Sequence, residues 1–403
     1  MKIYEIGTGY TSIPANKGAA TEIVVDELSH AFIRQGQDVT VVDIEDPKRL
    51  PTNLHIIEVP MPHGFMGTDE GLGIKHKLKR IIYSISLAKT LRHLLVNERE
   101  RIVLHFHNQY NAFFFYKLTT AHQRANAFVC YTNHSGAWNG SWSEIKQSIR
   151  SRYFQEAYSQ KCADLVFVLN KGTVENIQRH LGISLDRICL IKNGVNTELY
   201  RSLSTAERRE VRSRISETCS RYVFHCGSVC PNKGQLRAVQ ALTPFLTKDR
   251  SLFFCYAGGV IDSEYQTAIE SFCTQHGIFD QVRYLGEKAP GAELASFYGA
   301  ASLFVFPSVS EAFSLSVLES LACGVPVLQY RGAGTRIAIP ENDGLMNYSE
   351  NNEFSEKAGR LLYGDSNAYG IISKRARMYM TEHYSWNEIA RQYSSAITNR
   401  IGC

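Results

Sequence analysis

Two series of short apolar runs, each run followed by a loop and a helical pattern, constrain the fold of this chain more than any other feature. The first series predicts strands over 2–6, 38–44, 102–106, 127–131 and 165–169, and the second over 222–226, 252–257, 282–285, 303–306 and 325–330. Such alternation is typical of mostly parallel sheets with helices on both faces, so we expect an α/β protein. In these sheets ligands bind beyond the carboxyl ends of the strands.

The length of 403 residues allows two domains, each with its own core. The polar, charged segment 201–221 separates the two series, so we place the boundary near residue 200. This gives a first domain over 1–200 and a second over 201–383. Near the end of the chain, Trp386, Ile389, Ala390 and Tyr393 repeat at helical spacing and predict a helix with a buried face.

The composition narrows the class of protein. A hydrophobic content of 44% and a charged content of 21% are typical of a globular enzyme, and a net charge of +5 is too small to argue for nucleic acid. There is no signal-peptide pattern and no apolar run near twenty residues, so we expect a cytoplasmic protein. The ten cysteines show no Cys-x-x-Cys spacing, which favours reduced thiols over a metal site or a disulfide scaffold.

Two carboxylates stand eight positions apart, across a strand end and a helix start. The helix is expected to begin near Ser314, so Glu311 precedes its N-terminus, where the amides of 313–315 would point at an oxygen-rich or anionic group. Glu319 lies one turn into the helix and could bind a pair of hydroxyls. Taken alone, the two glutamates could equally be a capping acid and a solvated helix charge.

The residues around these acids resemble the E-x7-E signature of the retaining GT-B glycosyltransferases, family 4 in particular. The resemblance includes the Pro-Ser before Glu311 and the Leu-Glu-Ser-Leu-Ala-x-Gly-x-Pro-Val that surrounds Glu319. It implies two Rossmann-like domains that face a central cleft, the first for the acceptor and the second for a nucleotide-sugar donor. It also implies that 384–403 return from the second domain to the first.

The resemblance assigns roles on the donor side. Glu311 and the amides of Phe313, Ser314 and Leu315 would contact the donor sugar, and Glu319 would bind the nucleotide ribose. Ser314 stands where relatives usually carry glycine, so its side chain could change the choice of donor.

The segment 226–235 predicts a strand, a glycine loop and a helix, a geometry that presents amides and a lysine to phosphates. By resemblance, Gly227 belongs to this loop, Lys233 matches the family's lysine and Ser228 occupies the place of its arginine. Loss of one cation would cost about 2 to 4 kcal/mol of charge stabilisation. Either Arg237 or Lys288 compensates, or activity is lowered or lost.

Several further residues are expected at the site. Gly9 and Gly18 lie in the loop 7–18 on the acceptor side, which lacks the third glycine of a dinucleotide fingerprint. His134 follows a strand where relatives carry a histidine near the C6 hydroxyl of the sugar. Glu287, after the strand 282–285, would meet the nucleotide base.

His105 and His107 alternate along one strand, which sends both side chains to the same face. The competing explanation to a functional role is a buried polar pair.

The segment 75–95 combines lysines and arginines with leucines and isoleucines. Such a basic amphipathic helix could rest on a membrane and bring the enzyme to a lipid-linked acceptor. The alternative is a surface helix with one buried face.

The resemblance therefore implies a retaining glycosyltransferase, of the kind used in polysaccharide biosynthesis. It would move a hexose or N-acetylhexosamine from a nucleoside diphosphate, with uracil the expected base, to a hydroxyl of a glycan, lipid-linked or small-molecule acceptor. No protein nucleophile emerges, so we expect front-side substitution with Glu311, Lys233 and His134 as the catalytic residues. Neither a metal nor a cofactor is implied.

Two other functions remain open. A sugar-nucleotide epimerase on a similar scaffold would need no acceptor and would release no nucleoside diphosphate. A noncatalytic sugar-nucleotide-binding subunit is suggested by Ser228.

Overall fold

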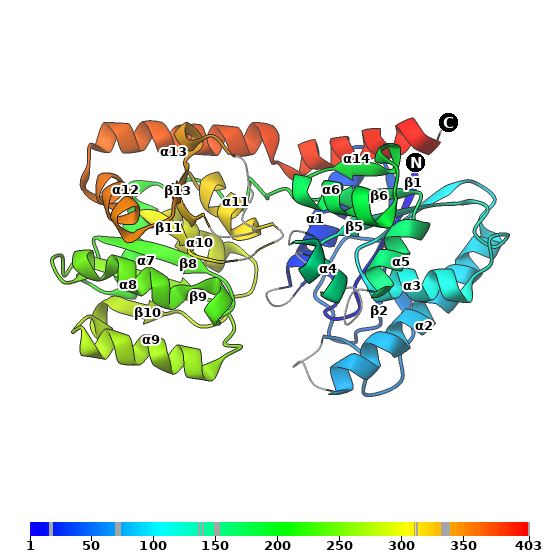
Figure 1. Cartoon of the computed structure of the whole chain (residues 1–403), viewed down its shortest axis with the longest axis horizontal. Helices are drawn as coiled ribbons and strands as arrows, with labels where there is room; N and C mark the ends of the chain where they lie inside the picture. The colour runs from blue at the N-terminus through cyan, green and yellow to red at the C-terminus, as the bar shows by residue number, and fades with distance from the viewer. Residues whose placement is uncertain are drawn as a thin grey trace. The chain divides into compact units, whose positions relative to one another are not determined.

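The computed structural model describes residues 1–15, 19–68, 74–135, 138, 141–148, 154–309, 311, 313–331 and 339–401. The chain divides into two compact units (Figure 1). Unit 1 comprises Met1–Asn193 and Trp386–Cys403, and unit 2 comprises Gly194–Ser385. Each unit is a parallel sheet with helices on both faces, which confirms the predicted α/β class.

The sheet of unit 1 has the order β3-β2-β1-β4-β5-β6-β7, and all neighbouring strands are parallel. Its strands are β1 (Lys2–Ile6), β2 (Asp38–Ile44), β3 (Ile56–Val59), β4 (Ile102–Phe106), β5 (Ala127–Asn133), β6 (Leu165–Val168) and β7 (Ile188–Leu190). The order reverses between β1 and β4, which pair although a helical region separates them in sequence. Open parallel sheets bind ligands at such a reversal, beyond the carboxyl ends of the strands.

The helices of unit 1 are α1 (Ala20–Arg34), α2 (Ile74–Asn97), α3 (Gln109–Leu118), α4 (Trp142–Ser148), α5 (Phe154–Cys162), α6 (Lys171–Leu181) and α14 (Trp386–Ile401). The last helix returns to unit 1, as predicted, and packs on α1 through the rings of Tyr393 and Phe32, whose centroids are 6.4 Å apart. Trp386, Ile389 and Ala390 are buried with Tyr393, so the predicted apolar face is confirmed.

The sheet of unit 2 has the order β10-β9-β8-β11-β12-β13 and is also parallel. Its strands are β8 (Arg221–Cys226), β9 (Leu252–Ala257), β10 (Val282–Tyr284), β11 (Leu303–Phe306), β12 (Val327–Tyr330) and β13 (Leu345–Tyr348). The order reverses between β8 and β11. The predicted strand 325–330 begins two residues later because the Val325 N–H closes the preceding helix, bonding Ser320 O at 3.0 Å.

The helices of unit 2 are α7 (Thr205–Ile215), α8 (Gln235–Leu246), α9 (Ser263–Gln275), α10 (Ala292–Ala300), α11 (Leu315–Ala322), α12 (Asn351–Tyr363) and α13 (Ser366–His383). The segment 201–221, expected to separate the domains, holds α7 and belongs to unit 2. A capping box between Ser204 and Glu207 begins this helix. Arg212 then ties it to the sheet by donating to Ala300 O at 3.0 Å and to Ser220 O at 2.7 Å.

Across the ranges described, no helix is both long and apolar enough to cross a bilayer. The cysteines of these ranges are free thiols, in agreement with the predicted reduced state.

The turn after β9 brings two backbones into contact in unit 2. Gly258 has φ +142°, and a Cβ there would lie 2.2 Å from Gly227 O. Gly286 has φ +79° with no atom within 4 Å of its Cβ position. Gly286→Ala should therefore lower the free energy of unfolding only by the cost of a side chain at positive φ, about 1 to 2 kcal/mol. Gly258→Ala must also displace the loop at Gly227, and we expect a distinctly larger fall in the free energy of unfolding.

Urea unfolding followed by circular dichroism measures both variants. Equal losses for Gly258→Ala and Gly286→Ala would contradict a rigid contact between the two backbones.

Candidate functional site

The loops that follow β8 and β11 meet at the strand-order reversal of unit 2. Lys233 ends the loop after β8, and Glu311 lies in the loop after β11. The Lys233 ammonium and the Glu311 carboxylate form an ion pair with an Nζ–Oε1 distance of 2.5 Å. Their side chains are 25% and 16% exposed, so both remain accessible. The structure thus brings the predicted cation and the predicted sugar-binding acid together.

The loop after β8 is held by its neighbours. Gly227 donates its N–H to Ala257 O at 2.9 Å, and Gln235 at the start of α8 donates to Ser228 O at 2.9 Å. A short 3-10 turn, Pro231–Lys233, leads into Gly234, whose φ of +74° allows the sharp entry to α8. This anchoring gives the predicted phosphate loop a fixed backbone.

A buried imidazole lies under the same loop. The His225 Nδ1 bonds Val305 O at 3.0 Å, while its Nε2 has no hydrogen-bond partner. Burial lowers the pKa of His225 to about 4, so the ring is neutral at physiological pH. A Cβ at Gly227 would stand 3.4 Å from this Nε2, which places the ring against the loop. His225 could not be predicted, because a single histidine in a strand is uninformative.

The loop after β11 ends at an uncapped helix. Val309 donates its N–H to Asn232 O at 3.0 Å, which ties this loop to the loop after β8. Ser314 is the N-cap of α11, but its hydroxyl pairs with the Ser316 hydroxyl at 2.8 Å and makes no capping bond. The amides of the first turn, which begins at Leu315, therefore receive no side-chain cap and can serve a ligand. Phe313 packs against the core of unit 2.

Glu319 projects from α11 toward the end of β8. Burial raises its pKa from 4.5 to about 6, and the nearby hydroxyls of Tyr298 and Tyr200 act in the opposite direction. Its charge also adds to the effect of burial on Cys226, the last residue of β8, whose thiol pKa rises to about 12. The second acid of the motif is thus half-buried beside the loop after β8, and two tyrosines that the sequence did not single out surround it.

The remaining donor-side predictions lie around these loops. Glu287 is exposed and stands beside Gly259, 3.4 Å from its Cβ position. Arg237 donates to Pro307 O at 2.8 Å and covers the Tyr330 ring, and Lys288 pairs with Glu293 at 2.8 Å. Arg237 and Lys288, the two cations expected to compensate for Ser228, are thus both engaged in other contacts.

A polar cluster occupies the strand-order reversal of unit 1, at the carboxyl ends of β1, β4 and β5. The two oxygens of Glu5 bond His105 Nδ1 at 2.9 Å and His107 Nε2 at 2.7 Å. The His107 Nδ1 bonds His134 Nε2 at 3.0 Å, and His105 Nε2 bonds the Thr132 hydroxyl at 2.7 Å. The predicted common face of His105 and His107 is confirmed. Their partner Glu5 was not predicted, since it lies about a hundred residues away in sequence.

The charges of this cluster are set by its burial. Burial raises the pKa of Glu5, but the charges and hydrogen bonds of His105 and His107 outweigh it and lower that pKa to about 2. Burial, and then the charge of His105, lowers the pKa of His107 to about 4. Burial and the neighbouring histidines hold the pKa of His134 well below its usual range. Glu5 is thus a carboxylate, and His107 and His134 are neutral imidazoles.

The same cluster has the donor atoms of a metal site, since those of Glu5, His105 and His107 lie within 4.8 Å of one another. Hydrogen bonds at ordinary distances already pair these atoms, so we interpret the cluster as a hydrogen-bonded network.

The loop after β1 is packed tightly against α2 and α3. Gly9 has φ +83°, and a Cβ there would overlap the Tyr83 ring at 2.2 Å. The Tyr83 hydroxyl and the Asn111 amide donate to Gly7 O at 3.2 and 2.9 Å. Packing therefore suffices to require glycine at position 9. Gly18, the other acceptor-side glycine predicted, lies outside the described residues.

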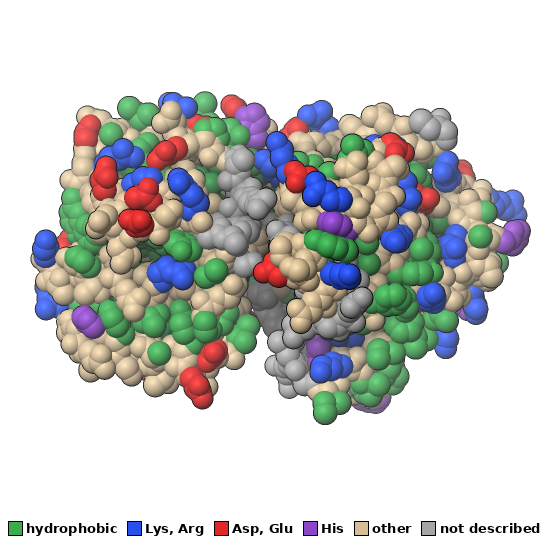
Figure 2. All heavy atoms as spheres, viewed as in Figure 1, with side chains coloured by type: hydrophobic (Ala, Val, Ile, Leu, Met, Phe, Trp, Pro, Cys, Tyr) green, Lys and Arg blue, Asp and Glu red, His purple; other side chains and the backbone are tan. Residues whose placement is uncertain are grey.

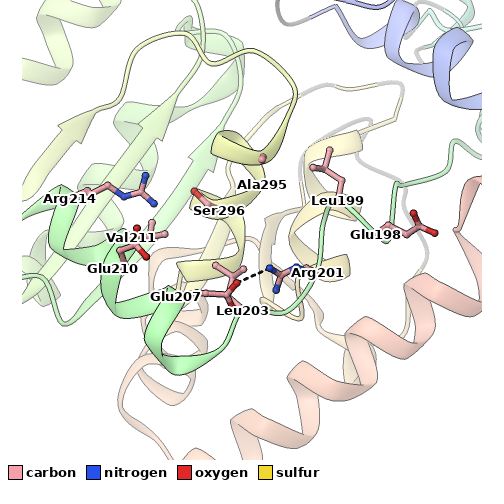
Figure 3. Close-up of a pocket in the computed structure, with 11 residues that line it drawn as sticks. Glu198, Leu199, Arg201, Leu203, Glu207, Glu210, Val211, Arg214, Ala295 and Ser296 are labelled. Carbon is pink, nitrogen blue, oxygen red and sulfur yellow. Dashed lines mark hydrogen bonds and ion pairs between the residues drawn. The ribbon is translucent and has the colours of Figure 1, made fainter. Parts of the chain in front are cut away.

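A separate hollow of about 330 Å³ opens on unit 2 between the segment 198–203, α7 and α10 (Figure 3). Its walls carry acids and arginines, including an ion pair between Arg201 and Glu207 at 2.7 Å. None of the predicted site residues lines it, so it is distinct from the loops after β8 and β11.

Comparison with known proteins matches each half of the chain to a family model. Residues 21–199 match the family described as Glycosyltransferase Family 4, and residues 207–378 match Glycosyl transferases group 1. A curated relative, the D-inositol 3-phosphate glycosyltransferase of Corynebacterium glutamicum, is 25% identical over 59% of this chain and 58% of its own length. The chain spans between 42% and 66% of the length of the first curated relatives that it matches.

Solved structures match over the full chain. Sucrose-phosphate synthase of Thermosynechococcus elongatus superposes with a TM-score of 0.79 at 19% identity, covering 100% of this chain and 99% of that one. The Anabaena HepE protein in complex with UDP-glucose gives 0.71 at 16% identity, covering 99% and 100%. These likenesses establish the GT-B fold.

The raised pKa of Glu319 makes a prediction about stability. A carboxyl that binds its proton more tightly when folded destabilises the fold above its folded pKa, and the cost is relieved as the pH falls through 6 toward 4.5. Glu319→Gln should therefore raise the melting temperature at pH 7.5, by the equivalent of about 1 to 2 kcal/mol. The difference should vanish near pH 4.5.

Glu287→Gln, which changes an exposed carboxylate of the same unit, serves as the control and should leave the melting temperature unchanged. A fall at pH 7.5 for Glu319→Gln would mean that the tyrosine hydroxyls more than offset the burial of this carboxylate.

Proposed function

We propose that this chain transfers a sugar from a nucleoside diphosphate to a hydroxyl with retention of configuration. In support, its two halves match glycosyltransferase family models, and its fold is GT-B. The ion pair between Lys233 and Glu311 carries this proposal. It places a cation for phosphate and an acid for sugar hydroxyls side by side, next to an uncapped helix N-terminus. A hexose or N-acetylhexosamine is the proposed cargo.

We propose that the donor diphosphate takes over Lys233 from Glu311. The phosphate oxygens would receive the ammonium and the amides of the loop after β8, and the released Glu311 carboxylate would accept hydroxyls of the sugar. Glu319 would accept the two ribose hydroxyls. HepE binds UDP-glucose, and we propose uracil as the base here as well, with Glu287 near it.

In the proposed reaction the bond from the anomeric carbon to the diphosphate oxygen breaks, and its electron pair leaves with the diphosphate. The acceptor oxygen bonds the same carbon from the same face, and its proton passes to the departing phosphate. Lys233 and the helix amides stabilise the charge that develops on that phosphate. These groups supply the electrostatics without a metal ion.

We propose that unit 1 binds the acceptor, a glycan, lipid-linked or small-molecule hydroxyl, and that His134 accepts a hydrogen bond from the C6 hydroxyl of the transferred sugar. The observation in favour is the position of His134 at the strand-order reversal, beyond the carboxyl end of β5.

A second candidate is a noncatalytic sugar-nucleotide-binding subunit. Ser228 stands where the family carries arginine, and both Arg237 and Lys288 are engaged elsewhere. Such a subunit would bind the donor without turning it over.

We propose that only the first turns of α2, and not the whole segment 75–95, contact a membrane. Tyr83, Leu87 and Leu91 are buried, so the later turns of α2 form the buried face of an ordinary surface helix. In the first turns, however, Ile74, Leu78 and Ile81 are 86%, 49% and 42% exposed, at the spacing of one helix face. Figure 2 shows hydrophobic and basic side chains close together over the α2–α3 part of unit 1.

Calorimetry with UDP, GDP, ADP and uridine tests the donor assignment, and release of nucleoside diphosphate from the matching sugar conjugates tests the reaction. In Lys233→Gln, affinity for the diphosphate should fall by about 2 to 4 kcal/mol, or about 30- to 900-fold, because the cation is lost. Affinity for uridine, which has no phosphate, should not change. Glu311→Gln breaks the same ion pair but keeps the cation, so it should retain or increase diphosphate affinity.

Equal losses for UDP and uridine would assign Lys233 a structural role. Binding without release of nucleoside diphosphate with any acceptor favours the noncatalytic subunit, and a changed sugar without release favours an epimerase. Binding of no nucleotide would refute the proposed donor site.

Flotation with liposomes tests the membrane contact. Vesicles that contain anionic lipid should retain the protein, and Leu78→Gln with Ile81→Gln should strongly reduce retention, because two of the three side chains of the exposed apolar stripe are removed. The matched control is Leu118→Gln at the end of α3, another exposed leucine of unit 1, which should leave retention unchanged. Absence of wild-type retention on anionic vesicles would rule the contact out.

A further inference from the structure

We propose that Glu5 and His107 are positioning residues that hold His134 with an unprotonated Nδ1, so that the site of unit 1 selects sugars that bring a hydrogen-bond donor to it. This inference rests on the proposed glycosyltransferase function and deepens it. It concerns the choice among sugars at the position that faces His134.

The tautomer of each histidine follows from the group to which its ring is hydrogen-bonded, starting from Glu5. Glu5 is a buried carboxylate and can only accept, so His105 Nδ1 and His107 Nε2 must both carry protons. A neutral His107 then has a lone pair on Nδ1. That nitrogen lies 3.0 Å from His134 Nε2, so His134 Nε2 must donate. His134 is left with a lone pair on Nδ1.

The carboxylate cannot turn away from this arrangement. Its second oxygen is held by His105, whose other nitrogen is hydrogen-bonded to the Thr132 hydroxyl at 2.7 Å. The Tyr393 hydroxyl of α14 stands 3.4 Å from that of Thr132. Glu5, His105 and Thr132 are fully buried, so no water competes for these bonds.

The segment that carries His134 is also fixed. Ser135 donates its N–H to the Asn133 side chain at 2.8 Å. Farther along, the Trp138 indole and the Tyr131 hydroxyl both donate to the buried Glu156, at 2.8 and 3.0 Å. The side chains of Tyr131 and Trp138, on either side of His134 in sequence, are therefore anchored, and the ring centroids of His134 and His107 are 5.3 Å apart.

The Nδ1 of His134 is the last nitrogen in this series of hydrogen-bonded rings, and it remains for a ligand. Within the described part of unit 1, no hydrogen bond reaches this atom, and the residue is half-buried rather than enclosed. Burial and the neighbouring histidines keep the ring neutral, which agrees with a lone pair at this position.

A fixed lone pair discriminates among sugars. A hydroxymethyl group can donate a hydrogen bond to it, a methyl group cannot, and a carboxylate would present a second acceptor. A site built around a hydroxyl rejects the analogue that lacks it, because its own polar group is left unpaired. We expect glucose-type sugars to be preferred about 100-fold or more over 6-deoxy and uronic acid counterparts.

Nitrogen NMR of the wild-type protein tests the tautomer without any assay of activity. With histidine labelled by 15N, and His134→Gln used only to assign the signals, His134 should show a protonated Nε2 and an unprotonated Nδ1 at pH 7. A protonated Nδ1 would overturn the proposal. Because this readout needs no nucleotide, it decides the tautomer of His134 even if the proposed function fails.

Variants test the consequence for specificity. For each variant, kcat/KM is measured with the glucose, 6-deoxyglucose and glucuronic acid conjugates of the base that the calorimetric panel selects. The specificity ratio is kcat/KM for the glucose conjugate divided by kcat/KM for either of the other two. In His107→Phe the ratio should fall to about 10 or less, because His134 is freed to change tautomer. In His107→Gln it should persist, since an amide can donate to Glu5 and accept from His134.

Thr132→Val is the matched control, because Thr132 reaches Glu5 only through the other histidine. Its ratio should equal that of the wild type. An unchanged ratio in a folded His107→Phe, or an equal fall in Thr132→Val, would overturn the proposal. If His107→Phe does not fold, the tautomer in the wild type and the ratio in His107→Gln still decide it.

Discussion

The reversal of strand order in each parallel sheet is the constraint on which the rest of the structure depends. At β1 and β4, and again at β8 and β11, two neighbouring strands send their following chains to opposite faces of the sheet. The carboxyl ends of these strands are therefore the places where loops diverge and leave room for side chains. Both polar clusters lie there, the histidine network in unit 1 and the Lys233–Glu311 pair in unit 2.

The two clusters solve different electrostatic problems. Lys233 and Glu311 are partly exposed and neutralise each other, so a ligand with both phosphate and hydroxyl groups could replace the contact without leaving either charge unpaired. Glu5 is enclosed and keeps its charge only because two imidazole N–H groups are directed at it. The Lys233–Glu311 pair can therefore exchange its contact for contacts with a ligand, whereas the hydrogen bonds to Glu5 stay in place.

The sequence predicted the class of fold and most strands, because a buried parallel strand is a continuous apolar run between turn residues. The edge strands β3, β7 and β13 were missed, since Ile56–Val59, Ile188–Leu190 and Leu345–Tyr348 are only three or four residues long. The motif placed Glu311 and Lys233 on adjacent loops. Glu5 could not be predicted, because its role depends on pairing with β4, about a hundred residues later in the chain.

Unit 1 contains the first and the last helix of the described chain, and unit 2 lies between them in sequence. During synthesis, the strands of unit 1 are made before unit 2. Helix α14 can cover their sheet only after all of unit 2 has been made. Until then Phe167 and His105 lack the ring of Tyr393 that packs on them at centroid distances of 4.4 and 5.5 Å. The histidine network is thus sealed only by a helix that is made after all of unit 2, so its completion must follow the synthesis of unit 2.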